Sequence, residues 1–150
     1  MSRYIKIFAV TIVSIIFITH FIIDLSVVDG SSMNPTIKDG EVIAVLKVGS
    51  VQRGDIVTLS LEDENHLIKR IVAVPGDHLK IENGELYING VISNDFSSPS
   101  HYKKWNGLEV RLNEDEYYVM GDNRDYSLDS RAYGVMNIDD ITGKVVFHFY

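Results

Sequence analysis

The sequence contains no cysteine and no cluster of lysine or arginine residues. The lack of cysteine excludes disulfides, catalysis by a thiolate and zinc sites with cysteine ligands. The formal net charge is −7, whereas nucleic-acid binding usually requires a basic surface that neutralises phosphates. A nucleic-acid partner is therefore not expected. Neither a metal nor another cofactor is expected, because no metal-site spacing links His66, His78, His101 and His148.

A long apolar run occurs only at the N-terminus. Residues 7–23 read IFAVTIVSIIFITHFII and carry no formal charge, and about 17–25 apolar residues are needed to cross a bilayer. Arg3 and Lys6 precede this run and Asp24 follows it; basic flanks favour the cytoplasmic side. We therefore expect a single-pass protein of the plasma membrane. Its predicted parts are a cytoplasmic N-terminus at 1–6, a transmembrane anchor at 7–23 and an extracytoplasmic domain at 24–150.

Two other interpretations of the apolar run compete with the anchor. A cleaved secretory signal also places basic residues before an apolar stretch. The nearest cleavage-like triplet, Val28-Asp29-Gly30, is weak because it lacks the A-x-A pattern. A buried core helix would carry polar residues at helical spacing, which this run does not. The anchor is the favoured interpretation.

The rest of the chain predicts a mostly β domain. Short apolar runs alternate with turn signals, and no long amphipathic helix is indicated outside the anchor. Asn83-Gly84 predicts a β-hairpin, and the polar stretch Ser93–Asn106 predicts an exposed loop. The spacing of the runs indicates mainly antiparallel strands. The predicted strands are Glu41–Lys47, Asp55–Leu61, His66–Val74, Leu79–Glu82, Leu86–Asn89, Tyr117–Met120 and Lys144–Phe149.

A first segment with potential chemistry follows the apolar run directly. It reads Gly30-Ser31-Ser32-Met33-Asn34-Pro35-Thr36. Glycine and proline favour a tight, irregular conformation that could present Ser32 outside a strand ladder. A serine hydroxyl is a poor nucleophile until a base removes its proton. By itself, the segment is better explained as an ordinary turn.

A second segment contains a lysine at an unusual position. If His66–Val74 is a strand, Lys69 shares one face with apolar residues, and Arg70 points to the opposite face. An ammonium group resists burial, so such a lysine must reach solvent, pair with an acid or lower its pKa. Only the last outcome makes a base, and burial can lower a lysine pKa by several units. The strand alone leaves all three outcomes open.

A third segment is rich in hydrogen-bonding groups. Residues 121–134 read GDNRDYSLDSRAYG. Its acidic residues could form a loop for a divalent cation, but it lacks the central glycine and terminal glutamate of an EF-hand. Arg124 and Arg131 would also repel a cation. Paired charges that support a site explain the segment better.

In this order, the apolar run and the three segments resemble bacterial type I signal peptidases. The shared patterns are S-M-x-P, K-R-I-V-x-x-P-G-D and G-D-N-R-D-x-S-x-D-S-R. The resemblance implies an antiparallel β barrel-sandwich of the LexA-like kind, and removal of signal peptides from exported preproteins after A-x-A-like residues.

The resemblance also implies roles for single residues. Ser32 would be the nucleophile, its backbone N–H would bind the oxyanion, and Lys69 would be the general base. Ser127 would orient Lys69, while Asp129 and Arg131 would form an ion pair that shapes the site. Shallow apolar pockets for substrate would be lined by Val28, Met33, Ile37, Leu67 and Ile68.

One departure from the family pattern concerns the oxyanion site. Some members carry a hydroxyl residue two positions before the nucleophile, and here that position is Gly30. The second oxyanion donor therefore has no assigned residue. Two rival functions are a self-cleaving repressor, which carries a DNA-binding domain instead of an anchor, and an inactive membrane-tethered binding protein. The rivals are disfavoured by the acidic charge and by the presence of both Ser32 and Lys69.

Overall fold

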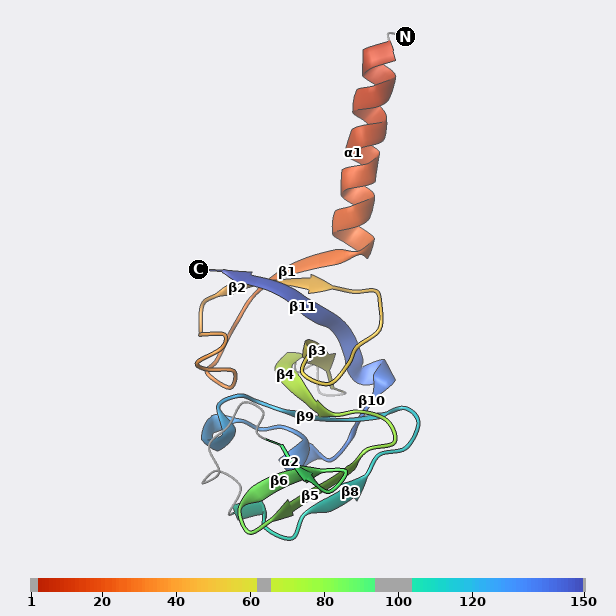
Figure 1. Cartoon of the computed structure of the whole chain (residues 1–150). Coiled ribbons are helices and arrows are strands. Elements are labelled where there is room, and N and C mark those ends of the chain that lie inside the picture. Colours follow the sequence, from red (N-terminus) through yellow and green to blue (C-terminus); the bar gives the residue numbers. More distant parts are fainter. Residues whose placement is uncertain (1–2, 62–65, 94–103, 150) are drawn as a thin grey trace.

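The computed structural model describes residues 3–61, 66–93 and 104–149. A helix, α1 (Arg3–Phe21), projects from a domain built of two antiparallel sheets (Figure 1). The larger sheet has the strand order β1-β2-β11-β3-β4-β9-β10, and the smaller sheet has the order β7-β6-β5-β8. The mostly β fold expected from the sequence is therefore confirmed.

The large sheet contains most of the predicted strands. Its members are β1 (Ile23–Val27), β2 (Val42–Leu46), β3 (Ile56–Ser60), β4 (His66–Ala73), β9 (Glu116–Met120), β10 (Met136–Asn137) and β11 (Ile141–Phe149). The strands β1, β2 and β11 lie at the end of the domain next to α1 (Figure 1). The short strands β1 and β10 were not predicted: the predicted anchor ends at Ile23, which is the first residue of β1, and β10 has only two residues.

The predicted anchor differs from the structure at its C-terminal end. α1 ends at Phe21, and Ile23 begins β1, where it pairs with Leu46. The carbonyl of Ile22 accepts a hydrogen bond from the N–H of Lys47 at 2.8 Å, so sheet pairing satisfies this backbone in place of a further helical turn. Within the described residues, no helix combines the length and apolarity needed to cross a membrane.

The small sheet confirms the predicted hairpin. Its strands are β5 (His78–Glu82), β6 (Glu85–Ile88), β7 (Val91–Ile92) and β8 (Glu109–Arg111). Asn83 and Gly84 connect β5 to β6 with φ values of 52° and 78°. Positive φ at both turn residues is typical of the type I′ turn that Asn-Gly favours. Most of the predicted loop Ser93–Asn106 lies outside the described residues, but Trp105 is partly buried against the core.

The strand β4 carries one buried charge on each of its two faces. Its side chains alternate, so that Lys69 and Arg70 point to opposite faces of the sheet. Both are buried in spite of their charge, with 2% and 6% of their surface exposed. The sequence predicted this alternation, and the strand register pairs Lys69 with Val57 of β3. The apolar clusters on the two faces therefore supply the desolvated surroundings of both groups.

Candidate active site

Ser32 lies in a loop between β1 and β2 that is closed at its base. The N–H of Val28 donates to the carbonyl of Glu41 at 2.8 Å, and the N–H of Gly40 donates to the carbonyl of Val28 at 2.9 Å. Gly30 has a φ of 102°, a conformation that side-chain-bearing residues rarely adopt. These features hold Ser32 on a turn outside the strand ladder.

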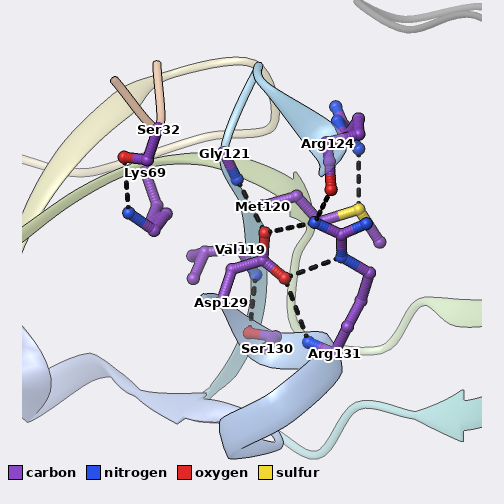
Figure 2. Close-up of polar contacts among 9 residues, drawn as sticks. All are labelled: Ser32, Lys69, Val119, Met120, Gly121, Arg124, Asp129, Ser130 and Arg131. Carbon is purple, nitrogen blue, oxygen red and sulfur yellow. Dashed lines mark hydrogen bonds and ion pairs between the residues drawn. The ribbon is translucent and has the colours of Figure 1, made fainter. Parts of the chain in front are cut away.

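The Ser32 hydroxyl contacts the buried amine of Lys69. Lys69 Nζ lies 2.9 Å from Ser32 Oγ (Figure 2). The amine also donates to the carbonyl oxygen of Ile68 at 2.9 Å. Burial lowers the pKa of Lys69 to about 8, against a smaller opposing effect of the Asp129 charge. A group within hydrogen-bond distance of a hydroxyl, and with a pKa near neutrality, has the properties of a general base.

Asp129 and Arg131 form a buried ion pair behind Lys69. Arg131 Nε and Nη2 each donate to the Asp129 carboxylate at 2.8 Å (Figure 2). The N–H of Gly121 donates to the same carboxylate at 3.0 Å. Burial by itself raises the pKa of Asp129. The hydrogen bonds and the charge of Arg131 lower it by more, so the net pKa of Asp129 is below its usual value. Asp129 therefore stays ionised beside the lysine.

Ser127 lies next to the nucleophile segment without bonding to the lysine. A Cβ atom added to Gly121 would lie 2.3 Å from Ser127 Oγ and 2.5 Å from the Ser32 carbonyl oxygen. Only glycine fits at this contact. Ser127 Oγ is buried and forms no hydrogen bond to any described residue. The expected hydrogen bond from Ser127 to Lys69 is absent in this conformation.

A network on the opposite face joins the three segments. Arg70 Nε and Nη2 donate to the two carboxylate oxygens of Asp122 at 2.8 and 2.6 Å. Thr36, in the same loop as Ser32, also donates to Asp122. The N–H of Asn123 donates to the Ser32 carbonyl at 2.9 Å. Sequence reasoning assigned no role to Thr36 or Asp122, although both lie inside the motifs; only the fold shows that they meet.

The backbone N–H of Ser32 is available to an incoming group. It forms no hydrogen bond among the described residues. The N–H of Gly30, in contrast, donates to Asp39 Oδ1 at 2.8 Å. Gly30 therefore does not supply the second oxyanion donor. The N–H of Ser32 remains the one candidate donor that we can name.

An open groove of about 550 Å³ runs from Ser32 and Lys69 toward the end of α1. One wall comes from β1 and the other from residues 66–69 of β4. Among the predicted substrate-binding residues, those that line it are Val28, Met33, Leu67 and Ile68. The prediction for Ile37 is corrected, because Ile37 is not among the residues that line the groove and is fully buried in the same apolar cluster as Met33. The sequence did not point to the groove residues Ser26, Thr58 and Thr142.

Comparison with known proteins supports the resemblance over the whole chain. The family model described as signal peptidase, peptidase S26, matches residues 1–150. A signal peptidase I P of Bacillus subtilis subsp. natto is 36% identical over 97% of this chain and 86% of its own length. A signal peptidase IB of Staphylococcus aureus strain Mu50 is 32% identical over 95% of this chain and 85% of its own length.

A solved structure is similar as well. The crystal structure of a signal peptidase I from Enterococcus faecalis V583 superimposes with a TM-score of 0.54 at 27% identity. The match covers 65% of this chain and 97% of that structure. The chain belongs to the signal peptidase family, peptidase S26, and it is a hydrolase of the serine endopeptidase class. The predicted family is thus confirmed, and the repressor alternative is excluded.

Proposed function

We propose that the protein removes N-terminal signal peptides from exported preproteins, with Ser32 as nucleophile and Lys69 as general base. The observation that carries this proposal is the 2.9 Å contact between Ser32 Oγ and a buried Lys69 Nζ. The family match supports the reaction class. The inactive binding protein remains the second candidate, and it is disfavoured because both members of the dyad are present and in contact.

The mechanism follows from the contacts of the dyad. The neutral amine of Lys69 accepts the proton of the Ser32 hydroxyl, and Oγ attacks the scissile carbonyl carbon. The free N–H of Ser32 stabilises the oxyanion. The Lys69 ammonium then protonates the departing amine, which leaves the signal peptide esterified to Ser32. Water, deprotonated by Lys69, hydrolyses this ester and regenerates the hydroxyl.

The groove suits an extended peptide beside β4. Residues 66–70 pair with β3, but β9 pairs with β4 only from Arg70 onward. Among the described residues, the other side of 66–69 therefore carries no strand, and these residues line the groove. An added strand binds through such a free edge, and pockets select its alternate side chains. The apolar side chains Val28, Met33 and Ile68 leave room for small residues, as A-x-A cleavage requires.

We also propose that α1 holds the enzyme at the extracytoplasmic face of the plasma membrane. Apolar side chains are exposed along α1, among them Phe8 and Val13 at 67% and 65%. Water does not favour such a surface, and a lipid bilayer does. The basic residues Arg3 and Lys6 would stay on the cytoplasmic side. Signal peptides emerging from the bilayer would then reach the groove from the α1 end.

The dyad is tested with the full-length protein in detergent and a preprotein whose signal ends in A-x-A. The wild type should cleave once, after the second alanine, with a rate that rises with pH through about 8, because Lys69 must be neutral to act. Ser32→Ala and Lys69→Met should each abolish the product. Ser31→Ala is the matched control and should keep most of the activity. Full activity of the Ser32→Ala variant would refute the proposal.

A further inference from the structure

Trp105 contacts the ion pair behind the base from outside the three motif segments. The Arg131 guanidinium carbon lies 5.5 Å from the centroid of the Trp105 ring. This is within the distance at which a cation is attracted to the face of an aromatic ring. Arg131 is 6% exposed, and the attraction is stronger when the cation is removed from water.

The ring contact adds to the hydrogen bonds that hold Arg131. Nε and Nη2 donate to Asp129, and Nη2 also donates to the carbonyl of Arg124 at 2.7 Å. These bonds lie in the plane of the guanidinium and fix its position within that plane. The Trp105 ring adds a further contact to the guanidinium beside these hydrogen bonds. Together they hold Arg131 against Asp129.

The position of Trp105 is set by the small sheet. The N–H of Gly107 donates to the carbonyl of Ile81 at 2.8 Å, and the N–H of Ile81 donates to the carbonyl of Leu108 at 2.8 Å. Both bonds attach the turn after Trp105 to β5. The indole also packs against the core cluster that contains Leu79 and Tyr118. The small sheet therefore has a rigid connection to Arg131.

We propose that Trp105 is a positioning residue of the active site, which holds Arg131 against Asp129 and thereby limits the effect of the Asp129 charge on Lys69. This inference rests on the proposed dyad. Asp129 acts on Lys69 through its charge and raises the pKa of the amine. If Arg131 moves away from Asp129, less of that charge is neutralised, and Lys69 holds its proton more strongly.

The charged groups around this arrangement are few among the described residues. Asp129 faces Arg131, Lys69 and the phenol of Tyr118, whose pKa is raised chiefly by burial and next by the Asp129 charge. The Trp105 ring contacts Arg131 and also the exposed Lys104, whose Nζ lies 5.3 Å from the ring centroid. A test must therefore separate the effect on Arg131 from any effect of Lys104.

Two substitutions in the full-length protein separate the aromatic face from simple packing. Trp105→Phe keeps an aromatic face, whereas Trp105→Leu keeps an apolar side chain without one. Cleavage of the same preprotein is measured from about pH 6 to pH 10, where the base titrates. In Trp105→Leu we expect the midpoint to rise by about half a pH unit, which slows cleavage at pH 7 about threefold. At high pH the rate should approach that of the wild type.

The controls decide between the possible explanations. Trp105→Phe and Lys104→Gln should keep the wild-type midpoint, and circular dichroism should show that all variants are folded. If Trp105→Leu lowers the rate equally at every pH, or if its midpoint equals that of Trp105→Phe, the positioning role is wrong. Ser32→Ala and Lys69→Met are measured in parallel: activity in these two variants would refute the dyad instead.

Discussion

At the scale of the residue, Lys69 is the group whose chemistry depends most on its surroundings. Its pKa is lowered to about 8 by burial, whereas a lysine in the unfolded chain titrates near 10.5. Between these values the unfolded state binds more protons than the folded state, so stability should rise with pH in this window. Below pH 8 the folded protein contains a buried ammonium group, at a cost of about 3 kcal/mol.

Replacement of Lys69 by an apolar residue should therefore abolish activity and increase the stability of the fold. We expect Lys69→Met to be inactive, but more stable than the wild type at pH 7 by about 1–3 kcal/mol. The difference should shrink as the pH rises from 8 toward 10.5, because the wild-type lysine becomes neutral in both states only above the higher of these two pKa values. Urea denaturation at several pH values measures this. The exposed Lys47 provides the control variant Lys47→Met, which should show no such trend; the same stability for Lys69→Met and wild type at pH 7 would contradict the expectation.

At the scale of the element, the geometry of the candidate site depends on one connection between three separate segments. Arg70 of β4 binds Asp122, which follows β9, and Asp122 also accepts from Thr36 in the nucleophile loop. The three groups are brought together by pairing of β4 with β9. Arg70 thus fixes the nucleophile loop from the face of the sheet opposite Lys69.

Removal of one partner should destabilise the protein more than removal of both. Arg70→Met leaves the buried Asp122 carboxylate without its cation, and we expect a loss of about 3–5 kcal/mol. The double variant Arg70→Met/Asp122→Asn should recover part of that loss. Urea denaturation measures both values.

An exposed ion pair supplies the control for this prediction. Lys80 and Glu82 are joined at 2.9 Å on the surface, and Lys80→Met should cost much less stability than Arg70→Met, because exposed ion pairs contribute little. Equal losses for Arg70→Met and Lys80→Met would show that the connection between the three segments contributes little to stability.

At the scale of the whole molecule, the end of the domain next to α1 presents an apolar face. Leu25 and Val27 of β1 are 65% and 67% exposed, and Phe147 and Phe149 of β11 are 61% and 45% exposed. Both pairs flank the same residues of β2 and so share one face of the sheet. This face continues the apolar surface of α1, and both would contact the proposed bilayer together.

A charged substitution on this face should affect membrane-bound substrates selectively. In full-length enzyme reconstituted into phosphatidylcholine vesicles, we expect Phe147→Glu to slow cleavage of a membrane-inserted preprotein several-fold, because burying a carboxylate in lipid is unfavourable. Cleavage of a soluble peptide should not change. Val91→Glu, on the distant small sheet and 70% exposed in the wild type, is the control. Equal rates for both variants on the membrane substrate would argue against contact of this face with lipid.

Local patterns were sufficient for much of the fold and for the nature of the site. Alternating apolar residues predicted seven of the strands, with ends that shifted by a few residues, and Asn83-Gly84 predicted its hairpin. The period-two alternation of a strand also placed Lys69 and Arg70 on opposite faces. Such features depend on neighbours in the chain, which the sequence displays directly.

Contacts between distant segments could be decided only by the tertiary structure. The strand β1 was missed because its pairing with β2, and not its composition, ends the helix. Whether Lys69 would reach solvent, find an acid or stay buried beside Ser32 depended on the packing of both faces of the sheet. The burial of Ile37 also depended on tertiary packing. So did the contact of Trp105 with Arg131, because Trp105 belongs to a segment whose composition predicts a loop. Residue types determined which chemistry was available; the low-dielectric surroundings that lower the pKa of Lys69 exist only where separate strands pack around it.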